Sequence, residues 1–360
     1  VRIVRGTVTG TLSFATTAVS SSCDSLAVTG QTSFLGSKCA LKNSTISAGL
    51  AMSGAATGDY PGMTITAYAN DDTVSGCSGT FAVTACTNAV DCIGVMWSRF
   101  CMRPVWTNNR FTITVNCPSI QDFQSNEYYW TMNGKWTDNY FAYVNHVGNG
   151  GACSGGNVKL GFALRDSCRF NTFVRDTFRV IAADAPSTQL RIANTGSVDR
   201  TEYNRFEDCL FWNDDGPGMF HGTGGDRSKG LIVQGCVVVS TTTYAFDDND
   251  NFPDSSIFRH NTFVSADKRV INQADDAVTA GKFVSNIIYS SAATLASSCV
   301  GQASVGCIFD AGATLMDSCL TYYPADVADS ARAFGNNGGT CWGPIAFDAT
   351  FRLKSPFFND

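Results

Sequence analysis

The sequence predicts an all-β protein: a right-handed parallel β-helix (solenoid) with a β-rich, cysteine-containing N-terminal region. Three observations lead to this fold class. Only 16% of the 360 residues are charged, and Ser, Thr, Asn and Gly supply much of the polar surface, which favours strands and turns. A short motif recurs along the second part of the chain, with Cys236, Asn261 and Asn286 spaced 25 residues apart. No stretch shows the hydrophobic period of an amphipathic helix.

Residues 1–105 are predicted to be a β-rich region, because short runs such as 6–14, 63–68 and 79–85 alternate in polarity. This region forms either a separate β-domain or the first coils of the solenoid. We expect most of its cysteines to be disulfide-bonded, since a segment with few large apolar side chains gains little from core burial. Those cysteines are Cys23, Cys39, Cys77, Cys86, Cys92 and Cys101.

Residues 106–360 carry a weak internal repeat. Its anchor is a small polar residue, Asn or Cys, followed two positions later by an aromatic or β-branched residue. A period near 25 residues with Gly, Asn and Asp in the turns fits a coil of three short strands and three turns. Because coils stack at the strand spacing of about 4.8 Å, we expect the anchors to form one inward column. The anchors are Asn139, Cys168, Cys209, Cys236, Asn261 and Asn286.

The anchors Asn261-Thr262-Phe263 and Asn286-Ile287-Ile288, the run at 317–324 (DSCLTYYP) and the ending at 347–356 (FDATFRLKSP) carry a family resemblance. The chain resembles the secreted parallel β-helix repeat proteins related to pectate lyases and phage tailspikes. The resemblance covers about residues 110–360. It implies the parallel β-helix fold and an extracellular role in contact with carbohydrates. It does not extend to a reaction, because neither the acidic set and downstream Arg of pectate lyases nor the Asp-Pro-His of alginate epimerases is matched.

The composition limits the classes of binding partner and the cellular locations that we expect. The net charge is −6 and Lys and Arg are scattered, so the basic footprint of a nucleic-acid-binding protein is missing. No segment reaches the roughly 18 apolar residues of a membrane span. Fifteen cysteines without zinc-site spacing favour a secreted or cell-surface protein, and their odd number leaves at least one free, masked or bonded to another chain, as in a homo-oligomer or filament.

Stacking the coils on their anchors brings two rows of polar residues to the turn side, where a solenoid presents groups to long ligands. Alternating carboxylates and cations in such rows suit a polysaccharide or cell-surface glycan, with Asp214, Asp247 and His221 as catalytic candidates. The alternative is structural, because Asn and Asp are favoured in turns for their own backbone bonds. The candidates for substrate binding are Arg175, Asp215, Lys268, Arg269 and two aromatic platforms, Trp130 and Trp136.

Ca²⁺ is the one cofactor that the sequence suggests. Asp248 and Asp250 lie in a run of hard oxygen ligands, which suit this ion. The run lacks the Gly and terminal Glu of an EF-hand loop. Two functions therefore stand side by side: a carbohydrate-binding or carbohydrate-cleaving protein, either a lyase or a glycoside hydrolase, and a non-catalytic structural or adhesive protein such as a filament subunit.

Overall fold

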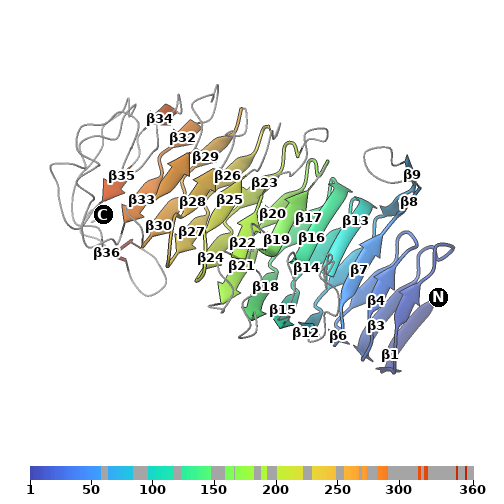
Figure 1. The fold of residues 1–360 in the computed structure, drawn as a ribbon. Helices are drawn as coiled ribbons and strands as arrows, with labels where there is room; N and C mark the ends of the chain where they lie inside the picture. The colour runs from blue at the N-terminus through green and yellow to red at the C-terminus, as the bar shows by residue number, and fades with distance from the viewer. Residues whose placement is uncertain are drawn as a thin grey trace.

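The chain forms a parallel β-helix in the computed structural model, with its coils stacked along one axis from the N-terminus onward (Figure 1). No α-helix occurs among the described residues. The predicted fold class is therefore confirmed. The structure describes residues 1–57, 64–83, 96–116, 123–146, 159–165, 167–181, 188–192, 201–221, 229–248, 255–266, 270–273, 282–290, 315–317, 320–322, 346–347 and 353–354.

The first face of the helix consists of short parallel strands, usually with one inward residue between two outward ones. The inward residue is large and apolar, for example Trp106, Trp136 and Phe173, none of which is exposed. The strands of this face are β5 (Ala40–Lys42), β11 (Thr73–Ser75), β14 (Val105–Thr107), β17 (Lys135–Thr137), β20 (Thr172–Val174), β23 (Arg205–Glu207), β26 (Ile232–Gln234), β29 (Ile257–Arg259), β32 (Lys282–Val284) and β34 (Leu315–Asp317).

The second face follows the first after a tight turn in each coil. Its strands are β6 (Thr45–Ile46), β12 (Ser78–Val83), β15 (Arg110–Asn116), β18 (Tyr140–His146), β21 (Thr177–Ile181), β24 (Leu210–Asn213), β27 (Val237–Ser240), β30 (Thr262–Ser265), β33 (Ile287–Ser290) and β35 (Leu320–Tyr322). They alternate inward and outward residues, as in β15, where Phe111 and Ile113 are buried and Arg110, Thr112 and Thr114 are not.

The third face is a separate sheet that closes the coil. The strands β1 (Arg2–Val8) and β3 (Ser22–Val28) begin the other two faces together, because β3 pairs with both β5 and β6. The third face contains β2 (Leu12–Phe14), β4 (Thr32–Phe34), β7 (Leu50–Ser53), β10 (Ala69–Asn70), β13 (Met96–Met102), β16 (Phe123–Met132), β19 (Lys159–Arg165), β22 (Thr188–Arg191), β25 (Met219–His221), β28 (Phe246–Asp248) and β31 (Ile271–Gln273).

Two antiparallel pairs lie outside the three faces. They are β8 (Ala55–Thr57) with β9 (Thr64–Ala67), and β36 (Ala346–Phe347) with β37 (Leu353–Lys354). The strands before residue 105 belong to the same sheets as those after it, since β14 pairs with β11 on one side and β17 on the other. This pairing favours the first coils of the helix over a separate domain for the N-terminal region, and the boundary at 105 stays a prediction.

The interior is held by stacked aromatic side chains. Trp136 and Phe173 stack with ring centroids 4.6 Å apart, and Phe173 stacks on Phe206 at 4.7 Å. Phe141 and Phe178 form a parallel stack at 5.6 Å on the second face. Rings from neighbouring coils therefore form columns that run along the axis, where large side chains bury the most apolar area.

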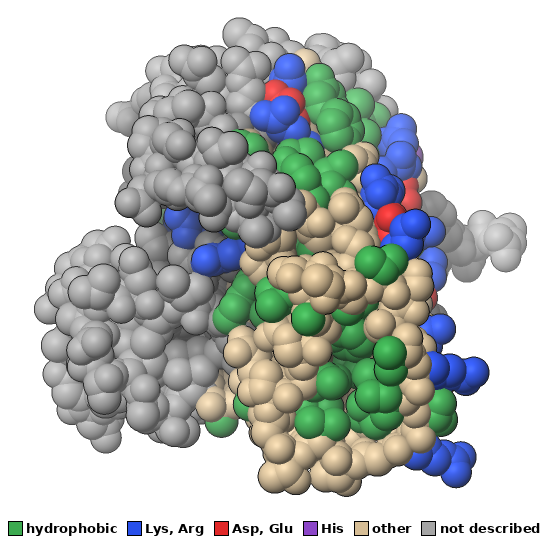
Figure 2. Space-filling model, turned by 90° about the vertical axis from the view of Figure 1, so that its right-hand side faces the viewer, with side chains coloured by type: hydrophobic (Ala, Val, Ile, Leu, Met, Phe, Trp, Pro, Cys, Tyr) green, Lys and Arg blue, Asp and Glu red, His purple; other side chains and the backbone are tan. Residues whose placement is uncertain are grey.

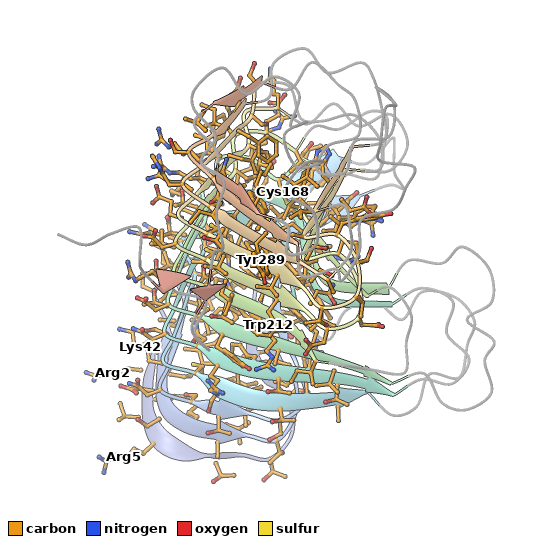
Figure 3. The ribbon with its side chains drawn as sticks, turned by 90° about the vertical axis from the view of Figure 1, so that its left-hand side faces the viewer. Arg2, Arg5, Lys42, Cys168, Trp212 and Tyr289 are labelled. Atoms are coloured by element: carbon orange, nitrogen blue, oxygen red, sulfur yellow. The ribbon has the colours of Figure 1, made fainter. Side chains whose placement is uncertain are left out.

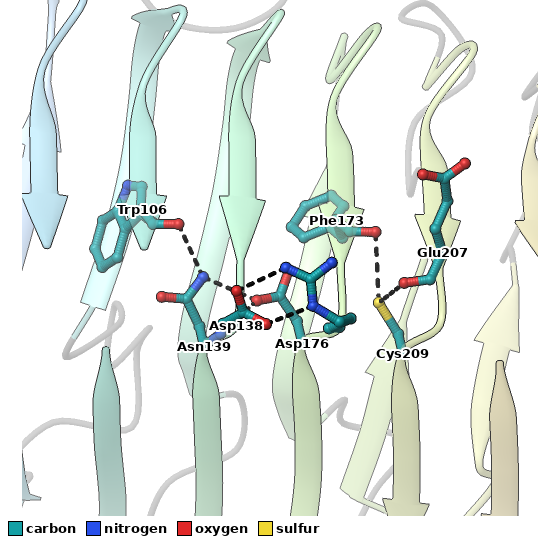
Figure 4. A network of polar contacts seen from close by, with 8 residues as sticks. Trp106, Asp138, Asn139, Phe173, Asp176, Glu207 and Cys209 are labelled. Atoms are coloured by element: carbon teal, nitrogen blue, oxygen red, sulfur yellow. Dashed lines mark hydrogen bonds and ion pairs between the residues drawn. The ribbon is translucent and has the colours of Figure 1, made fainter. Parts of the chain in front are cut away.

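A ladder of buried polar residues fills the turn between the first and second faces. Asn139 donates from Nδ2 to the carbonyl of Trp106 at 3.0 Å and to Oδ1 of Asp176 at 2.8 Å (Figure 4). The residue before each ladder position has positive φ, as at Asp138 and Arg175, so the turn is tight. The members of this ladder are Ser44, Cys77, Asn109, Asn139, Asp176, Cys209, Cys236, Asn261 and Asn286.

The predicted inward column is confirmed for five of its six members and wrong for Cys168. The register pairs Tyr140 with Thr177, which places Asp176, rather than Cys168, next to Asn139. Cys168 lies in another turn, where the neighbouring Arg169 bridges Met132 and Glu202. The misassignment arose because the coil with Asp176 is longer than the average repeat.

The disulfide prediction is contradicted for the described cysteines of the N-terminal region. Cys23, Cys39, Cys77 and Cys101 are free and buried, whereas Cys86 and Cys92 lie outside the described residues. Burial raises the pKa of the Cys77 thiol to about 11 and that of Cys101 to about 12. These thiols act as compact apolar and hydrogen-bonding groups of the interior. The prediction of a secreted location therefore has no support from paired cysteines.

Candidate functional site

The two predicted catalytic carboxylates come from neighbouring coils but emerge from different faces. Asp214 directly follows β24 of the second face, and its backbone N–H donates to Val180 at 3.3 Å. Asp247 lies within β28 of the third face, in register with Phe220. Each carboxylate therefore has its own surroundings.

Asp214 is held by a small outward cluster on the second face. Trp212 donates from Nε1 to Oδ1 of Asp214 at 2.6 Å, and an Arg179 Nη2 lies 4.0 Å from Oδ2. The guanidinium of Arg179 also lies over the Trp212 ring, 5.5 Å from its centroid. The Asp214 side chain is only 20% exposed. The cluster orients the carboxylate, which is the geometry a catalytic or binding carboxylate requires.

The turn after Asp214 is built by a buried asparagine. Oδ1 of Asn213 accepts from the backbone N–H groups of Asp215 and Gly216, both at 2.9 Å. Its Nδ2 donates to the carbonyl of Pro217 at 2.7 Å. Asp215 thus occupies a position in an Asx-type turn, which supports the structural explanation for its presence.

Three predicted site residues require correction. His221 is fully buried, as are its neighbours Met219 and Phe220 in β25, so it cannot touch a ligand at the surface. Trp136 is fully buried in the aromatic column and is not a platform. Arg175 forms a two-bonded ion pair with Asp138, at 2.6 and 2.7 Å, in the turn between the first and second faces and not beside Asp214.

Other predicted residues fall outside the described part of the chain. Lys268, Arg269 and Asp250 are among them, and the side chain of Asp248 is not described either. Among the described residues no group of three or more His, Cys, Asp or Glu could hold a metal ion. The Ca²⁺ site at Asp248 and Asp250 stays a prediction.

The structure brings together a set of outward residues that the sequence analysis missed. On the third face, Trp97 and Arg99 of β13 alternate with the buried Met96 and Ser98, so they point away from the core. The Arg99 guanidinium lies over two rings, 6.0 Å from the centroid of Trp97 and 5.9 Å from that of Tyr129. Such contacts hold a cation against aromatic faces.

The same row continues through the next coils. Tyr129 pairs in register with Arg99 on one side and Arg165 on the other. In β22, Arg191 is 1% exposed and lies over the Phe220 ring at 5.2 Å. Arg191 pairs in register with Ala163 and not with Arg165, so Phe220 and Asp247 lie in a neighbouring column, two residues further back along the strands.

We call Trp97, Arg99, Tyr129 and Arg165 the arginine–aromatic row. All four side chains are half-buried, which leaves them open to solvent while their positions are fixed by neighbours. Trp130, the second predicted platform, is also half-buried, and its ring centroid lies 6.5 Å from that of Tyr129. The signal for this row was the outward period-two pattern of β13 and β16, which becomes visible only once the coils are placed in register.

The described residues include no helix with the length and apolarity that a membrane crossing requires. No protein-family model matches the chain, and no curated protein matches it.

Several solved structures are similar to the chain. The periplasmic alginate epimerase AlgG is 7% identical over 92% of this chain and 76% of its own, with a TM-score of 0.42. A mannuronic acid specific polysaccharide family 6 lyase from human gut microbiota is 10% identical over 96% of this chain and 85% of its own, with a TM-score of 0.44. The Dettilon tailspike protein is 9% identical over 89% of this chain and 55% of its own, with a TM-score of 0.37. This likeness is one of overall fold.

Proposed function

We propose that the protein binds an acidic polysaccharide along the outer side of its third face. The observation that carries the proposal is the position of Arg99, which lies over both Trp97 and Tyr129 while Arg165 follows in the next coil but one. Guanidinium groups bind sugar carboxylates through paired hydrogen bonds. Aromatic rings bind the apolar faces of the same sugars.

The direction of the row suits a long ligand. Residues in register on neighbouring coils are about 4.8 Å apart, so the row runs along the helix axis and not across it. A chain of acidic sugars lying along the axis would meet cationic and aromatic groups in alternation.

Binding to acidic and neutral polysaccharides tests this proposal, measured by isothermal titration calorimetry at two salt concentrations. We expect an acidic polymer to bind and a neutral one to bind much more weakly, with the double variant Arg99→Ala/Arg165→Ala losing at least tenfold in affinity. The matched control is Arg110→Ala, because Arg110 lies over Tyr140 at 4.0 Å on the second face. Equal losses in both variants, or no binding by the parent protein, would overturn the proposal.

Cleavage of the bound polysaccharide is a further part of the proposal, and Asp247 is the residue we place closest to it. Asp247 is half-buried and follows two almost fully buried residues, Arg191 and Phe220, in the column beside the arginine–aromatic row. Asp214, held by Trp212 and Arg179, stays a second catalytic candidate on a different face. A protein that acts on such polymers would meet them at the cell surface or outside the cell.

The alternative function is structural, and one observation favours it. The first strand, β1, pairs with β3 on one side and with no strand among the described residues on the other. Figure 2 shows hydrophobic side chains gathered on this end of the molecule. Val1, Ile3 and Val4 are 87%, 44% and 50% exposed. Exposed apolar side chains on a strand of this kind could contact a second molecule and form a filament.

The exposed residues of this end allow a test by mutation. Arg2, Arg5 and Lys42 project from one side of the first coils (Figure 3). Sedimentation velocity should show concentration-dependent association that Ile3→Lys abolishes, if the end-to-end contact is real. A monomer at all concentrations would remove the filament alternative.

A further inference from the structure

Two cysteines occupy the same turn position in adjacent coils. Cys209 and Cys236 both belong to the ladder between the first and second faces, since Leu210 pairs with Val237 directly after them. Among the described cysteines they are the only pair so placed. Parallel strands bring such partners to about 4.8 Å between Cα atoms, which lies within the range of roughly 4.4–6.8 Å seen for disulfides.

One of the two sulfur atoms is already oriented toward the other residue. Sγ of Cys236 points toward the preceding coil and accepts from the backbone N–H of Cys209 at 3.4 Å. Sγ of Cys209 donates to the carbonyl of Phe173 at 3.5 Å, one coil further back. A rotation of the Cys209 side chain away from Phe173 would direct its sulfur at that of Cys236.

We propose that Cys209 and Cys236 form an oxidation site that closes to a disulfide between adjacent coils. The co-reactant is a low-molecular-weight disulfide such as oxidised glutathione. One cysteine thiolate attacks a sulfur of that disulfide, forming a mixed disulfide and releasing one small thiol. The second cysteine thiolate then attacks the protein sulfur of the mixed disulfide and releases the second small thiol. The protein gives up two electrons and the two thiol protons.

Burial controls when this reaction takes place. Both residues are almost fully buried, Cys209 at 2% and Cys236 at 1% exposure. Burial raises the pKa of Cys209 well above its ordinary value, which keeps the thiol protonated and unreactive in the closed coil. Oxidation therefore takes place in the refolding or locally opened chain. Once folded, the protein protects the cysteine pair from further reaction, whether the pair is a disulfide or two thiols.

Peptide mapping tests the pair directly. The protein is unfolded and reduced, refolded in a glutathione redox buffer, alkylated, and digested with trypsin under non-reducing conditions. The digest places Cys209 in the peptide 206–227 and Cys236 in the peptide 230–259, with no other cysteine in either. We expect these two peptides to be joined, with a mass two hydrogens below their sum, and a melting temperature that is higher for the oxidised than for the reduced protein.

The variants Cys209→Ser and Cys236→Ser should each remove the linked peptide and the difference in melting temperature. Cys77→Ser is the matched control, because Cys77 occupies the same ladder between Ser44 and Asn109 and has no cysteine neighbour. It should leave the linked peptide intact. Finding both peptides alkylated after oxidative refolding, or finding either joined to another cysteine, would overturn the proposal.

Discussion

Oδ1 of Asp176 accepts two hydrogen bonds from Asn139, one from its backbone N–H at 2.7 Å and one from Nδ2 at 2.8 Å. The other carboxyl oxygen of Asp176 is buried and has no hydrogen-bond partner among the described residues. Desolvation raises the pKa of Asp176 to about 7, against the opposing effect of the bonds from Asn139. Asp176 thus supplies a carboxyl group to the ladder, whereas most other positions of the ladder hold amides or thiols.

The first prediction concerns stability against pH. The native pKa of Asp176 lies above its unfolded value, so the native state holds the proton over a range in which the unfolded chain has lost it. The contribution to the free energy of unfolding is present below about pH 4 and is lost as the pH rises through about 7. Between pH 5 and 8 we expect this contribution to fall by roughly 2–3 kcal/mol, measured by urea unfolding.

The control is Asp176→Asn, which places in the ladder the amide already found at Asn139. An amide does not titrate, and its Nδ2 is expected to bond the carbonyl of Trp136 as Asn139 bonds that of Trp106. The variant should be more stable than the parent at pH 8 and should show a weaker dependence on pH. Asp72 accepts from the backbone N–H of Cys39 at 2.8 Å and also has a pKa raised to about 7. It should account for much of the pH dependence of stability that remains in Asp176→Asn.

The second prediction concerns the ladder itself. Asn261 accepts from the backbone N–H of Cys236 at 2.8 Å and donates to the carbonyl of Val233 at 2.9 Å. Asn261→Ala leaves both buried groups without a partner, so we expect a loss of roughly 2–5 kcal/mol in the free energy of unfolding. Asn261→Cys should lose clearly less, because Cys236 makes the equivalent contacts through its sulfur. Equal losses in chemical denaturation would show that the ladder does not depend on these bonds.

Much of the fold could be predicted from the sequence because its period is carried by single residues. Asn261 and Asn286 recur at the true coil spacing, and their place in one column is confirmed. The prediction failed at Cys168, because a Cys followed two positions later by Phe170 resembles the anchor, while the real anchor Asp176 is acidic. Variable coil length hides the register, and only strand pairing restores it.

The candidate site was less predictable for a related physical reason. Arg99 and Arg165 are 66 positions apart in the sequence and meet on one surface only through the intermediate strand that carries Tyr129. The sequence predicts Asp247 and His221 in one row, yet the register pairs Asp247 with Phe220 instead. In a strand, a shift of one residue turns a side chain from the surface to the interior. Such a shift places His221 in the interior, away from the candidate site.

The third prediction separates the two kinds of tryptophan. Trp136→Ala should cost roughly 3–5 kcal/mol of stability, because a fully buried ring that stacks on Phe173 leaves a large cavity. Trp97→Ala removes a half-buried outward ring and should cost much less. Calorimetric binding of an acidic polysaccharide, measured well below both melting temperatures, should be weakened by Trp97→Ala and retained by Trp136→Ala. The reverse order would place the ligand elsewhere on the molecule.

The last prediction concerns the two carboxylates. Asp247→Asn and Asp214→Asn keep the size of the side chain and remove its charge, and both residues are partly exposed, so each should change the free energy of unfolding by less than about 1 kcal/mol. If the polysaccharide is cleaved along the third face, Asp247→Asn should abolish the release of new chain ends, because that half-buried carboxylate lies on the third face, in the column beside the arginine–aromatic row. Asp214→Asn should leave turnover largely intact, since Asp214 belongs to the second-face cluster with Trp212. Loss of activity in the Asp214 variant alone would move the reaction to that cluster, and full activity in both variants would show that neither carboxylate takes part.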